Sequence, residues 1–139
     1  FDQEFLHVVL WPGHPLSDKS ELTLENIKDE ALIYYPESFS LHNYIRSFYQ
    51  KISARPIIIG QTSNWDFMGE MVRTKLGIAL LPQSICNRFN STQLKTIPLV
   101  EPKIPWTLAM VWKSRGFLSH STRMWVNSFK EYYKNPRIK

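Results

Sequence analysis

The stretch of this chain that most restricts its fold runs from Gly60 to Pro82. Ser63 is a suitable N-cap for a helix, and Asp66, three residues later, suits the positive first turn. The apolar residues that follow recur at helical spacing: Trp65, Met68, Val72 and Leu76. After Gly77, the uncharged run 78–81 is typical of a strand that is covered on both faces. The stretch therefore predicts a helix that leads into a buried strand, which is half of an α/β unit.

The end of this stretch resembles a family signature. Residues 71–82 read Met-Val-Arg-Thr-Lys-Leu-Gly-Ile-Ala-Leu-Leu-Pro. They resemble the V-A-A-G-L-G-I-A-L-L-P signature of the effector-binding domain of LysR-type transcriptional regulators. The sequence departs at residues 73–75, where the family usually has two small residues and a glycine. A glycine ends a helix in the left-handed conformation at little steric cost, so we expect either strain at Lys75 or a different helix end.

Two earlier segments repeat one construction, a strand followed by small polar residues and a helix start. Residues 31–35 form an apolar run that leads to a helix over about 41–52, and residues 57–60 lead to the helix described above. If the two strands are parallel neighbours, both helix starts open on one edge of the sheet, where a small anion can be held. The alternative at the first start is that one serine caps the helix and the other is solvated. The candidate contact residues are Pro36, Ser38, Phe39, Ser40, Gln61 and Thr62.

The segments around this core have weaker signals. Residues 5–11 predict a strand, and the His14-Pro15-Leu16 tripeptide after it resembles a family motif, with His14 read as a turn residue rather than a ligand contact. Thr23 is expected to cap a short helical turn over residues 24–28 that ends near Asn26 or Asp29.

The second half continues in the same alternation. We expect a short helix over 83–89, then a strand over 94–100 that Pro98 marks as an edge or irregular strand. Residues 106–112 predict a last strand that returns beside the first. A helix follows from Ser119 or Ser121, with Met124 or Trp125, Phe129 and Tyr132 on one face, and Asn135-Pro136 stops it.

The resemblance implies a fold class and a division of the chain. It implies an α/β fold, a three-layer αβα sandwich similar to type 2 periplasmic binding proteins, with a mixed, mostly parallel sheet. Residues 1–139 are then a partial effector-binding domain. Residues 12–105 are its second regulatory subdomain, and residues 1–11 and 106–139 are the crossing strands and the terminal helix of the first. The winged helix-turn-helix of the family is not part of this chain.

Composition narrows the functional classes. The formal net charge is +5, but the charges are scattered and only residues 134–139 are locally basic, so the chain itself is not expected to bind nucleic acid. Cys86 is the only cysteine, which excludes an intramolecular disulfide and favours a cytoplasmic location. No apolar run is long enough for a membrane span, and no signal peptide opens the chain, although its first residue is Phe1 and we expect a fragment.

The sequence has no pattern for catalysis or for a metal or other cofactor. The four histidines are far apart, no Gly-x-Ser-x-Gly or phosphate loop occurs, and Asp66 is better explained as a helix-start residue than as an acid or base. The resemblance instead implies a sensor for a small, anionic effector. It also implies a homodimer or homotetramer, and DNA binding through the absent winged helix-turn-helix. Two alternatives stay open: a solute-binding protein of a transport system with the same fold, and an enzyme built on this fold.

Overall fold

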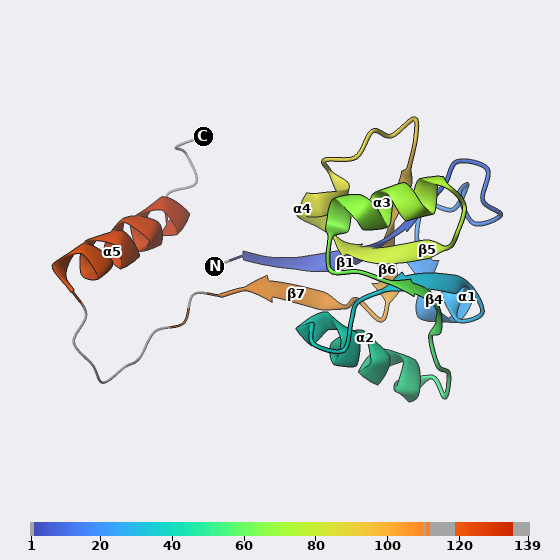
Figure 1. Cartoon of the computed structure of the whole chain (residues 1–139), viewed down its shortest axis with the longest axis horizontal. Helices are drawn as coiled ribbons and strands as arrows, with labels where there is room; N and C mark the ends of the chain where they lie inside the picture. Colours follow the sequence, from blue (N-terminus) through green and yellow to red (C-terminus); the bar gives the residue numbers. More distant parts are fainter. Residues whose placement is uncertain (1, 110, 112–118, 135–139) are drawn as a thin grey trace. The chain divides into compact units, whose positions relative to one another are not determined.

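The computed structural model describes residues 2–109, 111 and 119–134, which fall into two compact units. One unit comprises Gln3–Trp106, and the other comprises Phe1–Asp2 with Thr107–Lys139. The first unit holds the mixed α/β fold and the candidate site (Figure 1). In the part of the second unit that is described, α5 (His120–Lys134) is the one helix.

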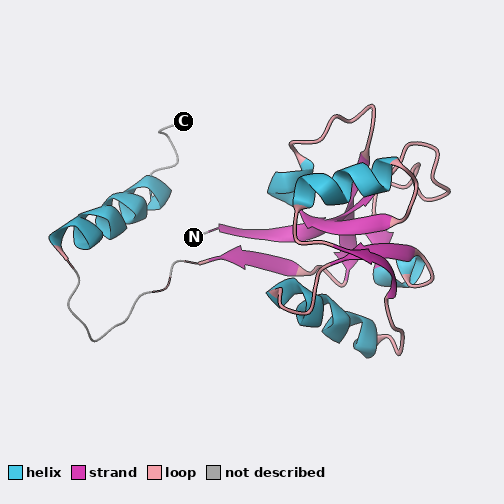
Figure 2. Cartoon of the chain, viewed as in Figure 1, coloured by secondary structure: helices cyan, strands magenta, loops and turns pink. Residues whose placement is uncertain are grey.

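The first unit is built on a mixed, mostly parallel sheet, as predicted (Figure 2). Its strand order is β2-β6-β1-β5-β3-β4, and β7 also pairs with β1. Strands β3, β4 and β5 are parallel, whereas β1 is antiparallel to both β5 and β6. The strands are β1 (Asp2–Leu10), β2 (Leu22–Thr23), β3 (Ala31–Tyr34), β4 (Ile57–Gln61), β5 (Ile78–Pro82), β6 (Lys95–Glu101) and β7 (Pro105–Leu108).

Helices cover both faces of this sheet. The chain crosses from β3 to β4 through α2 (Ser40–Lys51), and it returns past β3 to β5 through α3 (Trp65–Arg73). Because both crossovers are right-handed and run in opposite directions, they place their helices on opposite faces. Figure 1 shows α3 and α4 (Gln83–Cys86) on one side of the sheet and α2 on the other. This is the predicted three-layer arrangement.

The core confirms the interpretation of the central strand. Every residue of β5 is buried, so the strand is covered on both faces, as its unbroken apolar run predicts. Gly77 stands directly before it, and a Cβ atom at this position would lie 2.6 Å from the carbonyl oxygen of Ala31. The glycine of the signature is therefore required by the close approach of two backbones.

The start of α3 differs from the prediction. Asn64, not Ser63, is the N-cap, and its Oδ1 accepts a hydrogen bond from the Phe67 N–H at 3.0 Å. Asn ranks with Asp and Ser as a helix cap, so two suitable caps stood side by side in the sequence.

The end of α3 is the strained alternative that the sequence left open. Lys75 has a φ of +64°. The N–H of Lys75 donates to the carbonyl of Val72 at 2.8 Å, and the N–H of Leu76 donates to the carbonyl of Met71 at 3.2 Å. This pair of bonds is the Schellman motif that a glycine usually closes. Leu76 lies beyond the helix and is 44% exposed, so its predicted place on the buried face was wrong.

Several other elements have the predicted type but different details. Thr23 caps α1 (Leu24–Ile27), but Asn26 belongs to the capping box at its start rather than to its end. Strand β6 lies between β1 and β2, so it is not an edge strand. Its pairing with the two-residue β2 is irregular, as the other alternative predicted, because the register shifts between Leu22 and Thr23. His14 is a buried turn residue, as predicted, and its Nδ1 accepts the Leu16 N–H at 3.1 Å.

The C-terminal unit contains the predicted helix. The Ser119 hydroxyl accepts the N–H of Thr122 at 3.1 Å and so caps α5, while the predicted stop at Asn135-Pro136 lies outside the described residues. The Trp125 ring stacks on Phe129 at 5.4 Å. Val126 is buried, whereas Met124, Trp125 and Tyr132 are exposed. Among the helices that the structure describes, none is long and apolar enough to cross a membrane.

Candidate functional site

The two predicted helix starts lie side by side at the carboxyl edge of the parallel strands. Tyr34, at the end of β3, is in register with Gln61, at the end of β4. The N–H of Thr62 donates to the carbonyl of Tyr34 at 3.0 Å, which extends the pairing one residue beyond β4. The pairing brings the segment that begins at Pro36 and the segment Gln61–Thr62 to one edge of the sheet, which is where parallel α/β sheets bind ligands.

The start of α2 is open. Phe39 occupies the N-cap position and offers no side-chain oxygen to the first turn. The Phe39 N–H donates to the carbonyl of Pro36 at 2.9 Å, which fixes the loop. Ser38 and Ser40 are exposed, and within the described residues their hydroxyl groups make no hydrogen bond. The serine cap that was the alternative for this segment is therefore absent, and the first N–H groups of the helix remain available to an anion.

The start of α3 is already satisfied. In addition to the cap from Asn64, the Thr62 hydroxyl accepts the N–H of Asn64 at 3.1 Å. Thr62 is half-buried and Gln61 is exposed. Of the two helix starts, only that of α2 combines an uncapped first turn with exposed hydroxyl groups.

Aromatic rings pack near the two helix starts. The Phe39 ring stacks on Tyr35 with centroids 5.2 Å apart, and Trp65 meets Trp106 edge-on at 6.2 Å. Phe39 and Trp65 are half-buried and pack against the core. The Tyr35 hydroxyl donates to the carbonyl of Leu80 at 2.9 Å; burial raises the pKa of this hydroxyl, while the nearby Trp65 indole lowers it in part. The group therefore stays a neutral donor that ties the loop to β5.

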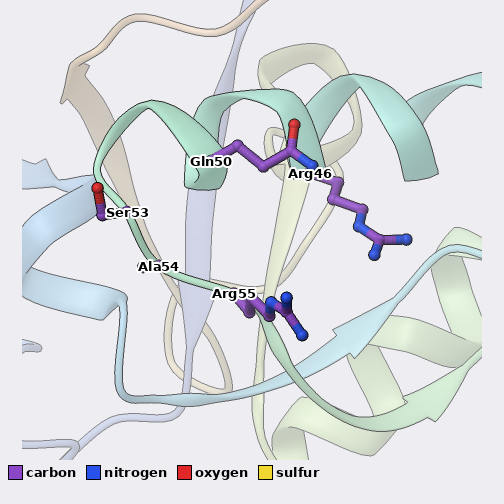
Figure 3. A pocket seen from close by; sticks show the side chains of 5 residues that line it. All are labelled: Arg46, Gln50, Ser53, Ala54 and Arg55. Carbon is purple, nitrogen blue, oxygen red and sulfur yellow. The ribbon is translucent and has the colours of Figure 1, made fainter.

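A pocket of about 210 Å³ adjoins this edge on the flank of α2 and β4. Of the six predicted contact residues, only Gln61 lines it. Pro36, Ser38, Phe39, Ser40 and Thr62 do not. Its lining comprises Tyr34, Glu37, His42, Arg46, Arg55, Pro56, Ile58 and Gln61. A second pocket of about 260 Å³ continues along α2 and shares both arginines; Figure 3 shows it with Arg46, Gln50, Ser53, Ala54 and Arg55.

The polar lining of this pocket includes a buried histidine that the sequence analysis did not single out. His42 is 4% exposed, its Nδ1 donates to the carbonyl of Tyr35 at 2.7 Å, and its own carbonyl accepts the Tyr34 hydroxyl at 2.8 Å. Burial raises the pKa of Tyr34 to about 12, against a smaller opposing effect of the Arg46 charge. The available signal was spacing: His42, Arg46 and Gln50 are four residues apart and form one polar stripe on α2.

The comparisons with known proteins identify the family. The family model described as "LysR substrate binding domain" matches residues 1–134.

The chain belongs to the LysR substrate-binding domain family.

Among curated proteins, the chain is similar to the uncharacterized HTH-type transcriptional regulator YwbI of Bacillus subtilis (strain 168). The two are 44% identical over 135 residues, which is 97% of this chain and 45% of the relative. The chain thus spans a little less than half the length of this relative.

Solved structures of LysR-type domains share the fold. The Synechocystis PCC6803 CcmR regulatory domain in complex with 2-PG matches with a TM-score of 0.79 at 16% identity, over 97% of this chain and 65% of the other. The effector-binding domain of QuiR in complex with shikimate matches with a TM-score of 0.76 at 20% identity, over 96% and 63%. At these identities the likeness shows the fold alone, which is the type 2 periplasmic-binding-protein fold that the sequence predicted.

Among the residues that the structure describes, no three His, Cys, Asp or Glu side chains come together as a metal site.

Proposed function

We propose that this chain is the effector-sensing and oligomerisation module of a LysR-type transcriptional regulator, and that its effector is a small anion. The effector contacts Ser38, Phe39 and Ser40 at the start of α2, and Gln61 and Thr62 at the end of β4, with Pro36 shaping the loop. The observation that carries the proposal is the uncapped first turn of α2, flanked by exposed serine hydroxyls and joined in register to β4.

Helix electrostatics favour an anion at this place. The free N–H groups and the positive end of the α2 dipole attract negative charge, and no acidic residue occupies the first turn of the helix. In the QuiR structure the bound molecule is shikimate, a carboxylate, which supports the same ligand class for this chain.

Sensing then works by linkage. Residues 12–105 form the second regulatory subdomain, and residues 1–11 and 106–139 belong to the first. A bound effector shifts the equilibrium between two arrangements of the regulator to the extent that it binds one of them more tightly. DNA is contacted through a winged helix-turn-helix outside this chain, and the regulator acts in the cytoplasm, where its DNA lies.

The edge of the sheet supports self-association. Strand β4 is the last strand in the order, and Ile57, Ile58 and Ile59 are 50%, 41% and 51% exposed. An exposed apolar edge strand is a template for contact with another chain. We propose that a second copy covers this edge in a homodimer or homotetramer.

The two other functional classes, a solute-binding protein and an enzyme, have less support. The matched family is one of regulators, which disfavours a solute-binding protein of a transport system. An enzyme needs an acid–base pair in its cleft, whereas the proposed contact residues are hydroxyl, amide and apolar groups. We propose that the chain is not an enzyme.

A thermal-shift screen of the intact regulator against small carboxylates, amino acids and inorganic anions tests the function. A ligand that binds only the folded state raises the melting temperature with its concentration. The Ser40→Ala variant should lose most of that rise while unfolding at the same temperature without ligand, because the Ser40 hydroxyl makes no hydrogen bond within the described residues.

Ser47→Ala is the matched control. It removes a hydroxyl from the same helix, where Ser47 donates to the carbonyl of Tyr44, away from the helix start. It should keep the full ligand response. Equal responses of the wild type, the Ser40 variant and the Ser47 variant would remove the α2 start from the site.

A further inference from the structure

We propose that the pocket on the flank of α2 and β4 binds a small oxyanion, a phosphate or carboxylate group, through Arg46, Arg55 and His42. This site differs from the proposed effector loop. Of the proposed effector contacts only Gln61 lines the pocket, whereas both arginines do. The proposal rests on the arginines and His42, and therefore stands independently of the effector assignment.

Local structure brings the two arginines to one pocket. Arg46 lies in the middle of α2, and the chain reverses after the helix through Ser53, whose φ is +55°. The N–H groups of Ser53 and Ala54 close this turn on the carbonyls of Gln50 and Tyr49, both at 3.0 Å. Arg55 follows directly. Figure 3, which shows the adjoining second pocket, has the side chains of Arg55 and Arg46 extending in the same direction.

The charge of the two guanidinium groups is not neutralised. Within the described residues, neither Arg46 nor Arg55 has a carboxylate within ion-pair distance, although other surface cations such as Arg73 and Lys28 do. The lining of the pocket contains one carboxylate, that of Glu37, against two guanidinium groups. Guanidinium groups donate paired hydrogen bonds in the geometry of phosphate and carboxylate oxygens. An oxyanion is the ligand that this lining favours.

A buried imidazole provides the second, independent observation. His42 is 4% exposed and lines the pocket, and its Nδ1 is engaged by the carbonyl of Tyr35. Because a carbonyl can only accept, Nδ1 carries a proton, and Nε2 is left for the pocket. Neutral Nε2 accepts a hydrogen bond from a protonated ligand oxygen, and protonated Nε2 donates one. Among the residues that the structure describes, Nε2 of His42 has no hydrogen-bond partner, so the charged pocket contains a polar atom that is available to a ligand.

The size of the pocket limits what it holds. Its volume of about 210 Å³ is below the roughly 300 Å³ at which pockets for whole drug-sized ligands begin. It suits one phosphate or carboxylate group rather than a whole larger ligand. A carboxylate on a second copy of the chain has the same chemistry, and the experiment below separates the two sources.

Binding of inorganic phosphate to the intact protein tests the proposal. Titration is followed by phosphorus NMR at constant ionic strength, so that general screening does not change. The wild type should show saturable binding. The double variant Arg46→Gln/Arg55→Gln should raise the Kd by at least about tenfold, because it removes charge-assisted hydrogen bonds. The control Arg73→Gln/Arg88→Gln removes the same charge from exposed positions outside the pocket and should stay within about twofold.

Three outcomes would overturn the proposal. The first is absence of saturable binding, or equal loss in the double variant and its control. The second is loss of phosphate in Ser40→Ala and not in the arginine variant, which would place phosphate at the start of α2. The third is that sedimentation shows the arginine variant dissociating into single copies while its phosphate binding is unchanged. That result would mean that a carboxylate of a second copy occupies the pocket.

Discussion

Replacement of Lys75 by glycine should stabilise this protein. Lys75 has a φ of +64°, and it closes the Schellman motif at the end of α3. The left-handed conformation costs a residue with a Cβ roughly 1 kcal/mol or somewhat more. Lys75 is exposed, and within the described residues its side chain forms no ion pair, so its removal sacrifices little else.

The net gain in the free energy of unfolding is smaller than the strain energy that the substitution removes. Glycine adds conformational freedom to the unfolded chain, which offsets about 0.4–1 kcal/mol. The difference leaves a stabilisation of about 0.5 kcal/mol. With a urea m-value of about 1.5 kcal/mol/M, the midpoint of unfolding should rise by roughly 0.3 M.

Equilibrium urea unfolding followed by tryptophan fluorescence and circular dichroism measures this shift. Lys75→Ala is the matched control, because it removes the amine but keeps the Cβ, and it should not reproduce the gain. Ser53→Gly repeats the test at the end of α2, where the same motif has a φ of +55°. A Lys75→Gly variant that unfolds at a lower urea concentration than the wild type would refute the reasoning about strain.

Two further predictions concern the core and the pH dependence. Gly77→Ala should lower the free energy of unfolding by about 1–3 kcal/mol, because its Cβ would lie 2.6 Å from the Ala31 carbonyl oxygen. Gly60→Ala, which meets only the flexible end of Met71, should cost less in the same urea titration, and the reverse order would contradict the argument. Burial lowers the pKa of His7 below its ordinary value of 6.5, against a smaller opposing effect of Glu4. The unfolded state then binds more protons just below pH 6.5, so unfolding free energy should fall as pH drops from 7 through 6.5 toward the folded pKa. His7→Gln should reduce this slope, and an unchanged slope would exclude His7 as its cause.

The central strands of the sheet could be predicted from the sequence because the signals for them are local. The apolar run of β5 and the repeated strand–helix starts define their own structure, and the close approach of backbones fixes Gly77. Helix caps were harder, since Ser63 and Asn64 are both good caps and only the packing of α3 selects between them. The place of β6 depended on the two-residue β2, which is too short to give a periodic signal.

The sequence predicted which sheet edge brings the candidate residues together, but not the lining of the neighbouring pocket. The carboxyl edge of β3 and β4 follows from topology, and the six contact residues remain a prediction. The flank pocket depends on Arg55, which a turn returns to α2, and on His42, which contacts the Tyr35 carbonyl and the Tyr34 ring. These contacts join residues seven or more positions apart in the sequence, so the pattern of any one segment does not show that the side chains meet.

The two helix starts differ in a way that the topology of the sheet does not predict. Both starts follow a parallel strand and meet at one edge, so the fold gives each of them the same dipole and the same free N–H groups. Asn64 satisfies one start from its own side chain, whereas Phe39 leaves the other open. Ligand preference at this edge is thus decided by single capping residues. A cap introduced by Phe39→Asn should compete with an anionic effector at α2, and an effector affinity that does not fall in this variant would show that the first turn of α2 is not where the anion binds.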